Sequence, residues 1–396
     1  MGAVGAMGSA LAADAAVFII TTMQTQPLTV SRLRAFRMCG RNYEYKYLVG
    51  LVPNRESEAL VTGRLFHQAL HEIATGQSID VAIESVWSYF GAAIEQAEDA
   101  DEARALAIQD VTIRTLLHGY QWRWGNDPIQ ILASEKRAPR RPLTNPATGR
   151  TSRRWHLDGV IDKLIYYRGS EMVMEHKTTS QSIDSDSPYW RRLQLDAQIS
   201  QYVIIARELG LEVQSVLYDV VRKPTIKPKT VALADGRDLK IVLDQGGERV
   251  LNKNGSPRQT GDTKLGYTLQ VRPETAEEYA KRIAKDIEVN YDNYFRRIEV
   301  ARTEDELKAH MADAWNDALA ISDARKRGHF CRDTDRCITP LTNHRCPFLP
   351  ICTAGTQSID KANPPEGYHL GQQDPELTQQ EDRDHGNNHN GATAAA

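Results

Sequence analysis

The sequence predicts a mixed α/β fold, because helical and strand-like patterns follow one another along a chain that is long enough to bury a large core. The chain has 396 residues, of which 41% are hydrophobic and 26% are charged. These fractions are ordinary for a globular protein. Helix-like periodicity dominates the first third, and short β-branched runs follow it. We therefore expect a mixed central sheet flanked by helices, with a helical region folded over it from the N-terminal side.

The individual elements are predicted from periodicity and from turn signals. A first helix is expected over 31–52, with Ser31 as its N-cap. A turn at 168–170 is expected to join two neighbouring strands. Further helices are expected at 60–73, within 79–124, and at 194–208, 274–290 and 303–325. Strands are expected at 129–135, 155–167, 172–176 and 213–221.

The composition divides the chain into a leader, a main domain and a tail. Residues 1–28 read as an irregular leader or an over-extended start. A secretory signal is not expected, because a signal begins with basic residues and this segment has no Lys or Arg before Arg32. Residues 29–355 form the expected domain, with a hairpin or flap insertion at 224–272. Residues 356–396 are polar and are expected to be disordered. No apolar run approaches the ~18 residues that span a bilayer, so no membrane association is expected.

The charge is unevenly distributed along the chain. The formal net charge is −3, but seven acidic and two basic residues follow residue 354. The rest of the chain is therefore slightly basic. Seven basic residues and no acid occur between 136 and 154: Lys136, Arg137, Arg140, Arg141, Arg150, Arg153 and Arg154. Such a stretch is either a solvated loop or a surface that binds phosphates.

An acidic–lysine cluster carries the chemical signal. Asp162 ends the motif Gly-x-x-Asp, and Glu175 stands two residues before Lys177 on the next predicted strand. Residues i and i+2 of a strand share a face, so the three side chains can converge. Two carboxylates can hold Mg²⁺, with the backbone carbonyl of His176 as a further ligand. Lys177 can then orient or deprotonate a water for phosphodiester hydrolysis. The alternative is a surface hairpin with an ordinary Glu/Lys pair.

Three further residues complete an ordered motif set. His67 closes Gly-x-x-x-His on the helix at 60–73, and Gln198 and Tyr202 lie four residues apart on the helix at 194–208. In the order GxxxH, GxxD, ExK and QxxxY, the sequence resembles the RecB-type branch of the PD-(D/E)xK nuclease superfamily. It is most similar to phage and prophage exonucleases related to the CRISPR-associated RecB-like nuclease. The resemblance covers roughly residues 30–355.

This resemblance implies a PD-(D/E)xK restriction-endonuclease-like core and a role for each motif residue. His67, Asp162 and Glu175 would bind Mg²⁺ or Mn²⁺, and Lys177 would be the catalytic lysine. Gln198 and Tyr202 would position DNA. The implied activity is hydrolysis of DNA as an exonuclease on single strands or ends, in phage or prophage recombination, replication or repair.

Three neighbouring residues leave alternatives open. Asp158 is the rival of Asp162, although it fits the spacing after the glycine badly. Glu135 can support the metal or form a structural ion pair. His71 lies one helical turn after the motif histidine and reads as an ordinary helix residue, because neither HExxH nor HxxEH is present.

The cysteines indicate a second cofactor. Four of the five lie within 22 residues near the C-terminal end, and Cys39 lies about 300 residues earlier. Four thiolates suit zinc or an iron–sulfur cluster, and metal-free buried thiols are the alternative. The resemblance implies a 4Fe–4S cluster, which would link the N-terminal end of the domain to its C-terminal end. It selects Cys39, Cys337, Cys346 and Cys352, with Cys331 as the alternative to Cys337.

The expected partner is therefore DNA, as single strands or ends, with a recombinase or helicase as a further partner. Cluster cysteines imply a reducing compartment, the cytoplasm of a bacterium or of a phage-infected host. A second hypothesis, from another class, is a non-catalytic iron–sulfur or zinc protein that binds DNA alongside a helicase or recombinase. Degradation of labelled DNA separates the two hypotheses.

Overall fold

A computed structural model describes residues 25–232, 240–244, 246, 248–260, 267–269, 271–339, 344–355 and 359–372. Its centre is a sheet of five described strands in the order β14–β8–β7–β6–β3. The strands β7 and β8 run parallel, and the other neighbouring pairs are antiparallel. Their bounds are β3 (Gln130–Arg137), β6 (Val160–Tyr167), β7 (Ser170–Thr179), β8 (Ser215–Arg222) and β14 (Phe295–Ala301).

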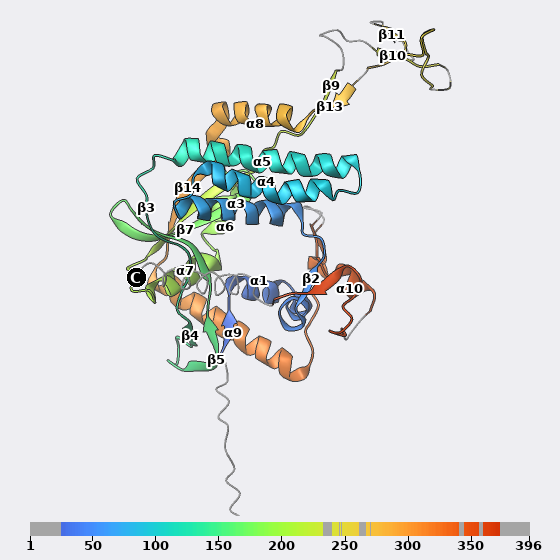
Figure 1. The fold of residues 1–396 in the computed structure, drawn as a ribbon. Coiled ribbons are helices and arrows are strands. Elements are labelled where there is room, and N and C mark those ends of the chain that lie inside the picture. Colours follow the sequence, from blue (N-terminus) through green and yellow to red (C-terminus); the bar gives the residue numbers. More distant parts are fainter. Residues whose placement is uncertain are drawn as a thin grey trace, which may run out of the picture.

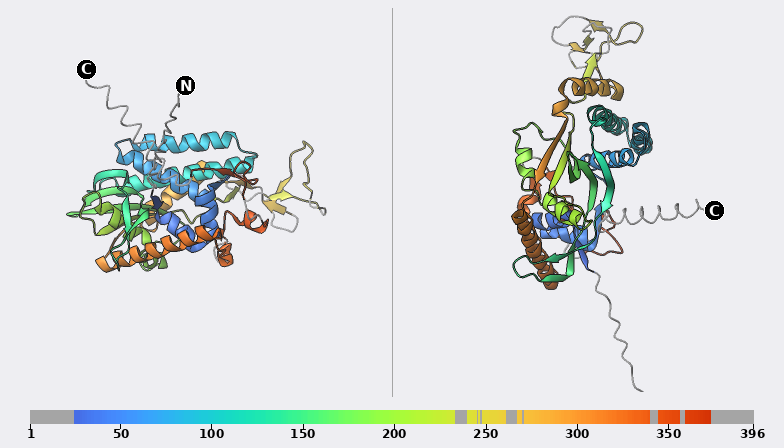
Figure 2. Two further views of the ribbon diagram at one scale, coloured as in Figure 1. Left: turned by 90° about the horizontal axis from the view of Figure 1, so that it is seen from below. Right: turned by 90° about the vertical axis from the view of Figure 1, so that its left-hand side faces the viewer.

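Helices cover both faces of this sheet (Figures 1 and 2). On one side lie α3 (Glu58–Ala74), α4 (Ile79–Glu95), α5 (Ala100–Trp124) and α8 (Ala276–Asn290). On the other side lie α1 (Val30–Met38), α7 (Ala197–Arg207) and α9 (Glu304–Arg327). The two helical layers enclose separate hydrophobic cores, because successive strand residues point to opposite faces. The predicted mixed α/β architecture with a helix-flanked sheet is confirmed.

The crossover between β7 and β8 positions the helix that carries Gln198 and Tyr202. A parallel pair needs a long connection, and here it contains α6 (Pro188–Leu193) and α7. Asp196 caps α7, since its carboxylate accepts the N–H of Gln198. The first turn of α7 therefore starts beside the end of β7, and the predicted helix at 194–208 is confirmed in its main part.

The predicted helix over 31–52 is wrong in its length and in its cap. Thr29, and not Ser31, caps α1. The helix ends before Cys39, whose backbone is extended, and the chain continues as α2 (Gly40–Tyr43), a π-helix (Glu44–Val49) and β2 (Leu51–Pro53). The break exposes the Cys39 thiol to the C-terminal segment, where the Asp333 N–H points at its sulfur at 3.5 Å. Tertiary contact outweighs helical propensity here.

The predicted strand over 155–167 is also wrong, because the chain divides at Asp158-Gly159. Its first part, β5 (Thr151–Leu157), belongs to another sheet with β1 (Gln26–Leu28) and β4 (Arg141–Thr144). A Cβ added to Gly159 would lie 3.2 Å from the Ile205 side chain and 3.3 Å from Tyr202. Only glycine fits comfortably this close to α7, so the backbone can turn from one sheet into the other.

Part of the predicted disordered tail is ordered. Residues 368–370 form β17 (Tyr368–Leu370), which pairs antiparallel with β2. The Tyr368 ring stacks on Phe348 at 6.1 Å between centroids, and its hydroxyl donates to the Pro347 carbonyl at 2.6 Å. An aromatic anchor next to α10 (Leu349–Thr353) explains this order. Residues 1–24 of the predicted leader and residues 373–396 of the predicted tail lie outside the described residues.

The described parts of the insertion project from the molecule beyond α8 (Figure 1). They comprise the pair β9 (Thr230–Ala232) and β13 (Val271–Pro273), and a small sheet of β10 (Lys240–Val242), β11 (Gln259–Thr260) and β12 (Tyr267–Leu269). Short elements complete the described chain: 3₁₀ turns at Tyr291–Asn293 and Thr334–Arg336, and the pair β15 (Ile338–Thr339) and β16 (His344–Arg345).

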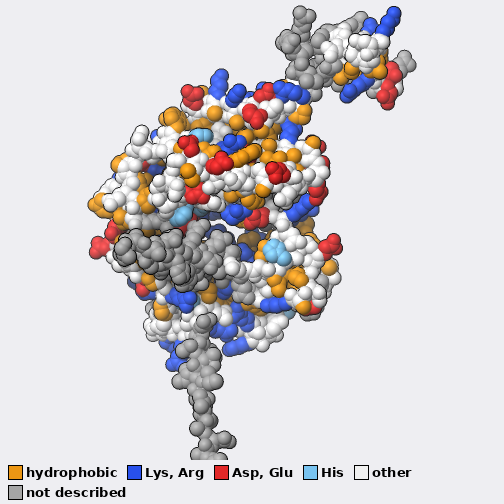
Figure 3. Space-filling view, viewed as in Figure 1, with side chains coloured by type: hydrophobic (Ala, Val, Ile, Leu, Met, Phe, Trp, Pro, Cys, Tyr) orange, Lys and Arg blue, Asp and Glu red, His pale blue; other side chains and the backbone are white. Residues whose placement is uncertain are grey.

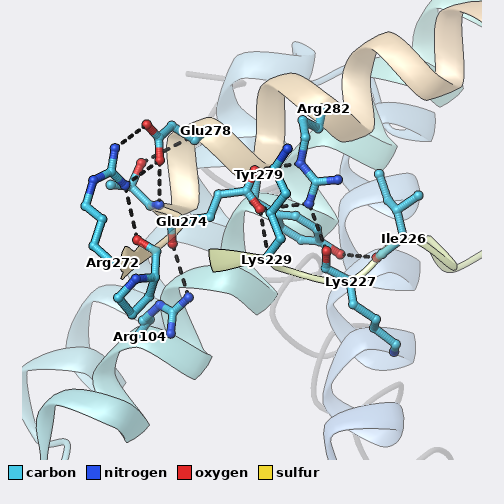
Figure 4. A network of polar contacts seen from close by, with 11 residues as sticks. Arg104, Ile226, Lys227, Lys229, Arg272, Glu274, Glu278, Tyr279 and Arg282 are labelled. Atoms are coloured by element: carbon cyan, nitrogen blue, oxygen red, sulfur yellow. Dashed lines mark hydrogen bonds and ion pairs between the residues drawn. The ribbon is translucent and has the colours of Figure 1, made fainter. Parts of the chain in front are cut away.

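A polar network ties the base of the insertion to α8 (Figure 4). The Glu274 carboxylate is almost fully buried and accepts two bonds from Arg282, at 2.6 and 2.7 Å. It also accepts the Lys229 N–H at 3.1 Å, while Arg104 donates to the Glu274 carbonyl at 3.2 Å. A bidentate Arg–carboxylate pair fixes geometry well, so the projecting strands start from a rigid base.

A buried histidine makes the stability of the fold depend on pH. His310 on α9 is 5% exposed, and burial, followed by the charges of Arg37 and Arg302, lowers its pKa to about 4. Between this value and the ordinary pKa near ~6.5, the unfolded chain binds the extra proton. Stability should therefore fall as the pH drops through this window, by about 3 kcal/mol for this group.

Urea titrations from pH 7 to pH 4 measure this effect. The stability of His310→Leu should decline less over this range than that of the unsubstituted protein. Parallel declines of the two proteins would contradict the assignment.

Candidate active site

The two motif carboxylates meet where the β6–β7 hairpin opens. The backbone pairing runs from Tyr167 opposite Ser170 to Lys163 opposite Met174. One step further, Asp162 stands opposite Glu175, and the Asp162 carboxylate accepts the His176 N–H at 2.9 Å. A side chain thus takes the place of a strand carbonyl, and the predicted convergence of the two strands at this point is present in the structure.

Glu175 is the most buried acid of the cluster, with 2% of its surface exposed. Its Oε1 accepts the Lys177 ammonium and, at 2.7 Å, the Gln198 amide. Its Oε2 is buried without a hydrogen-bond partner among the residues described. Burial, together with the nearby negative charge of Asp162, raises the pKa of Glu175 to about 7. The carboxylate is therefore held where an additional positive charge would stabilise it.

His67 reaches the same point from the opposite layer. It lies on α3, and its Nδ1 is 3.3 Å from Oδ2 of Asp162. Burial acts against charging either group. The ion pair outweighs it, so the pKa of Asp162 is lowered and that of His67 is raised. Burial is likewise outweighed at Lys177, whose pKa the two acids raise. All four predicted residues thus lie together.

A cleft of about 750 Å³ opens over this cluster. Its walls come from α1, α3, β3, β6 and α7, and in Figure 3 the surface is hollowed between the α3 and α1 layers. Two arginines line its mouth, Arg34 on α1 and Arg64 on α3, each of which is also paired with a carboxylate. His67, Asp162, Gln198 and Tyr202 all line the cleft. The polar cluster is therefore accessible from solvent.

The structure separates Asp162 from its rival. Asp158 is fully buried and bound by Arg137 at 2.8 Å and by His156 at 3.2 Å, and these contacts outweigh burial and lower its pKa. It therefore serves an internal ion pair. Glu135 stands opposite Asp162 on β3, with a positive φ of 51°, and lines the cleft. His71 bonds Ser134 at 2.8 Å, as expected of an ordinary helix residue.

The Gln-x-x-x-Tyr pair lies against the acids. Gln198 links Glu175 to α7 through the hydrogen bond of its side-chain amide. The same side chain also hydrogen-bonds the Tyr202 hydroxyl. Burial, with the nearby negative charges of Glu175 and Asp162, raises the pKa of Tyr202 well above its usual value, so the phenol stays protonated. In this structure Gln198 therefore holds Glu175, and contact of the pair with DNA remains a prediction.

A buried polar network behind the site was missed at the sequence level. The His176 side chain points to the opposite face of the sheet, where its Nδ1 is 2.9 Å from Asp219. Asp219 also accepts Arg297 at 3.0 Å and the Tyr120 hydroxyl. Arg297 also donates to the Tyr120 hydroxyl, so the contacts join positions up to 177 residues apart, which no local pattern reveals. An acid inside the apolar run of β8 was the available signal, since buried acids need partners.

The cysteines gather near the end of α1. The Asn42 amide approaches the Cys346 sulfur at 3.6 Å. The pKa of Cys337 is raised, chiefly by burial and next by the nearby thiols of Cys346, Cys352 and Cys39. Cys331 instead contributes its carbonyl, which accepts the Arg41 N–H. Within the described chain, no three side chains of the types that bind metals form a ready-made metal site.

Comparisons with known proteins add a family to this geometry. The sequence profile of the PD-(D/E)XK nuclease superfamily matches residues 27–353. A crystal structure of a protein provisionally named an exonuclease, from Eubacterium rectale, aligns over 86% of this chain and 95% of its own, with 13% identity and a TM-score of 0.40. No curated protein matches the chain. Among the described residues, no helix has the length and apolarity that a membrane crossing requires.

Proposed function

Since this chain belongs to the PD-(D/E)XK nuclease superfamily, we propose that it is a deoxyribonuclease that depends on Mg²⁺ or Mn²⁺. The observation that carries the proposal is the convergence of Asp162, Glu175 and Lys177 with His67, beside an open cleft that His67 and Asp162 line. The order of the four motifs further supports a place in the RecB-type branch. That resemblance also supports exonucleolytic action on single strands or ends in phage or prophage recombination, replication or repair.

The residues present fit a hard divalent cation. Asp162 and Glu175 supply carboxylate oxygens, and Oε2 of Glu175 is buried with no hydrogen donor among the described residues. Magnesium prefers such oxygen ligands and keeps several waters. His67 and the His176 carbonyl are the further ligands that we propose. When bound, the ion would supply Lewis-acid polarisation of the scissile phosphate.

The chain's own groups can then carry out hydrolysis. Water attacks phosphorus, a new P–O bond forms, and the bond from phosphorus to the leaving oxygen breaks. The attacking water loses a proton to solvent, and the leaving oxygen takes one up from solvent. Lys177 extends from the same strand face as Glu175, so its ammonium can hold the water and stabilise the extra negative charge of the transition state. Gln198 keeps Glu175 in place, because its side-chain amide donates a hydrogen bond of 2.7 Å to the carboxylate. Tyr202 remains a protonated donor beside the acids.

The cysteine group is proposed to bind a 4Fe–4S cluster through Cys39, Cys337, Cys346 and Cys352, with zinc as the alternative. The proximity of the other three thiols to Cys337 supports this choice over Cys331. We expect anaerobically purified protein to show a broad visible absorption band from the cluster. Cys346→Ser should abolish the band and, as a link between distant segments is lost, lower stability by roughly 2–4 kcal/mol on the disulfide analogy.

Two results of the same experiment would argue against this assignment. Cys331→Ser is the matched control and should keep both absorption and stability. Colourless protein with bound zinc would show that the cysteines hold zinc and not an iron–sulfur cluster. Equal losses in the two variants would contradict the proposed ligand set.

Incubation of the protein with end-labelled DNA tests the proposed function. In Mn²⁺, single strands labelled at the 5′ or the 3′ end should be shortened progressively from one end, and the two labels report the direction. Duplex and RNA arms define the substrate. DNA that is bound but never cut would instead favour the non-catalytic binding protein, and no binding at all would contradict both functions.

A further inference from the structure

Four exposed basic side chains lie on the side of the molecule away from the insertion. Three come from the β4–β5 hairpin and one from the end of α9: Arg150, Arg153, Arg154 and Lys326. We call them the β5–α9 basic surface. All four are exposed, and none has a carboxylate partner within the described chain. In Figure 3, blue side chains gather in the lower part of the molecule, where Figure 1 places β5 and α9.

Contacts around one indole ring hold the two segments together. The Trp155 Nε1 donates to Ser322 at 3.0 Å, which fixes β5 against α9. The guanidinium groups of Arg154 and Arg325 lie 5.8 and 5.4 Å from the centre of the Trp155 ring. Arg325 is half-buried and finds the neutral side chains of Gln26 and Tyr43 as partners. Positive charge is thus concentrated at a fixed place, and none of the described carboxylates pairs with Arg154 or Arg325 there.

An ordinary structural explanation covers only part of this surface. Basic residues in the last turn of a helix complement its dipole, and that accounts for the end of α9. It does not account for the three arginines of a β-hairpin. Of the seven basic residues predicted as one stretch, Arg137 and Arg141 are paired with Asp158 and Glu208. The remaining hairpin arginines are the ones that face solvent.

The surface and the active-site cleft lie at opposite ends of β5, whose residues from Trp155 onward are buried. β5 runs directly into Asp158 and Gly159, which line the cleft, and β1, its parallel neighbour, runs into Thr29 and Val30, which line it as well. Arg154 is four residues before Asp158, or roughly 13 Å along an extended chain. Along a DNA duplex, in which each strand rises about 3.4 Å per nucleotide, this separation corresponds to about four nucleotides.

We propose that the β5–α9 basic surface binds the phosphate backbone of the substrate strand outside the cleft. The inference rests on the proposed nuclease function and names the part of the substrate that this surface would contact. Fixed guanidinium groups without acid partners neutralise phosphates and release counterions. Contacts of this kind carry no sequence information, so the surface would increase affinity for long strands of any sequence.

The test measures binding, separately from cleavage. Fluorescence anisotropy with metal-free buffer and labelled oligothymidines of about 5 and about 20 nucleotides compares the protein with the variant R150Q/R153Q/R154Q. The matched control K253Q/K281Q/K285Q removes the same charge from exposed lysines elsewhere. For the long strand we expect roughly 10- to 100-fold weaker binding near 0.1 M salt, and a salt slope smaller by about 2. The short strand and the control should change little.

Several results would overturn the inference. A salt slope that equals that of the control would mean that the arginines touch no phosphate. Equal weakening for short and long strands would place the arginines inside the cleft or show a general charge effect. If the unsubstituted protein cuts DNA while the variant binds as tightly, the inference fails and the proposed function stands. If the unsubstituted protein neither binds nor cuts DNA, the proposed function fails.

Discussion

Glu175→Gln should lower the rate of DNA cleavage at least about a thousandfold, because it removes one of the two carboxylates that we propose as metal ligands. A bound metal contributes several kcal/mol to the transition state, and about 4 kcal/mol corresponds to a factor of 10³. The amide keeps the shape of the side chain. It cannot accept the Lys177 ammonium as a carboxylate does, and its oxygen has no formal charge for the cation.

Metal binding provides an independent measurement for this variant. A ligand that binds the folded protein raises its melting temperature by mass action. Added Mn²⁺ should therefore raise the melting temperature of the unsubstituted protein and leave that of Glu175→Gln unchanged. Glu171→Gln, on the same strand, is the control and should respond like the unsubstituted protein. A variant that still binds Mn²⁺ and cuts DNA normally would show that Glu175 is not a metal ligand.

Lys177→Met should reduce kcat by roughly 10² to 10⁴, while DNA binding and the affinity for metal change much less. Methionine fills similar space but lacks the ammonium that pairs with Glu175. The expected loss falls on kcat, because the positive charge acts mainly as the transition state gains negative charge. Single-turnover cleavage of labelled single strands gives the rate.

Lys136→Met is the matched control for that experiment. Lys136 is exposed on the neighbouring strand β3, and its replacement removes the same charge without touching the acids. Lys177→Arg separates two roles, since Arg keeps the charge but cannot give up its proton at ordinary pH. Substantial rescue by Arg would show an electrostatic role. Equal activity of Lys177→Met and the control would remove the lysine from the mechanism.

The convergence of the candidate residues was easier to predict from the sequence than the local folds that carry them. Asp162, Glu175 and Lys177 occur within 16 positions of one hairpin, so the period of a strand suffices to bring them together. The divided elements at Cys39 and Asp158 were not predictable in this way. At both positions the chain breaks a regular element to meet partners far along the sequence, Asp333 for Cys39 and Arg137 for Asp158.

Long-range pairing also explains the elements that were missed. β14 forms an edge of the central sheet, but the consecutive Arg296 and Arg297 interrupt the apolar–polar alternation of its sequence. The partners of Arg297 are Asp219 and Asp127, which lie far away in the sequence. The strand at 368–370 is held by pairing with the distant strand β2 and by the Tyr368 ring on Phe348. Neither element contains a local pattern strong enough to stand out from a loop.

Diffraction from crystals soaked in Mn²⁺ tests the central claim most directly, because the anomalous signal locates the ion without reference to activity. We predict a peak at the floor of the cleft, with Asp162 and Glu175 as ligands and Lys177 beside it. The crystals of Glu175→Gln should lack that peak. A peak bound elsewhere, or one that leaves both carboxylates uncoordinated, would contradict the nuclease proposed for this cleft.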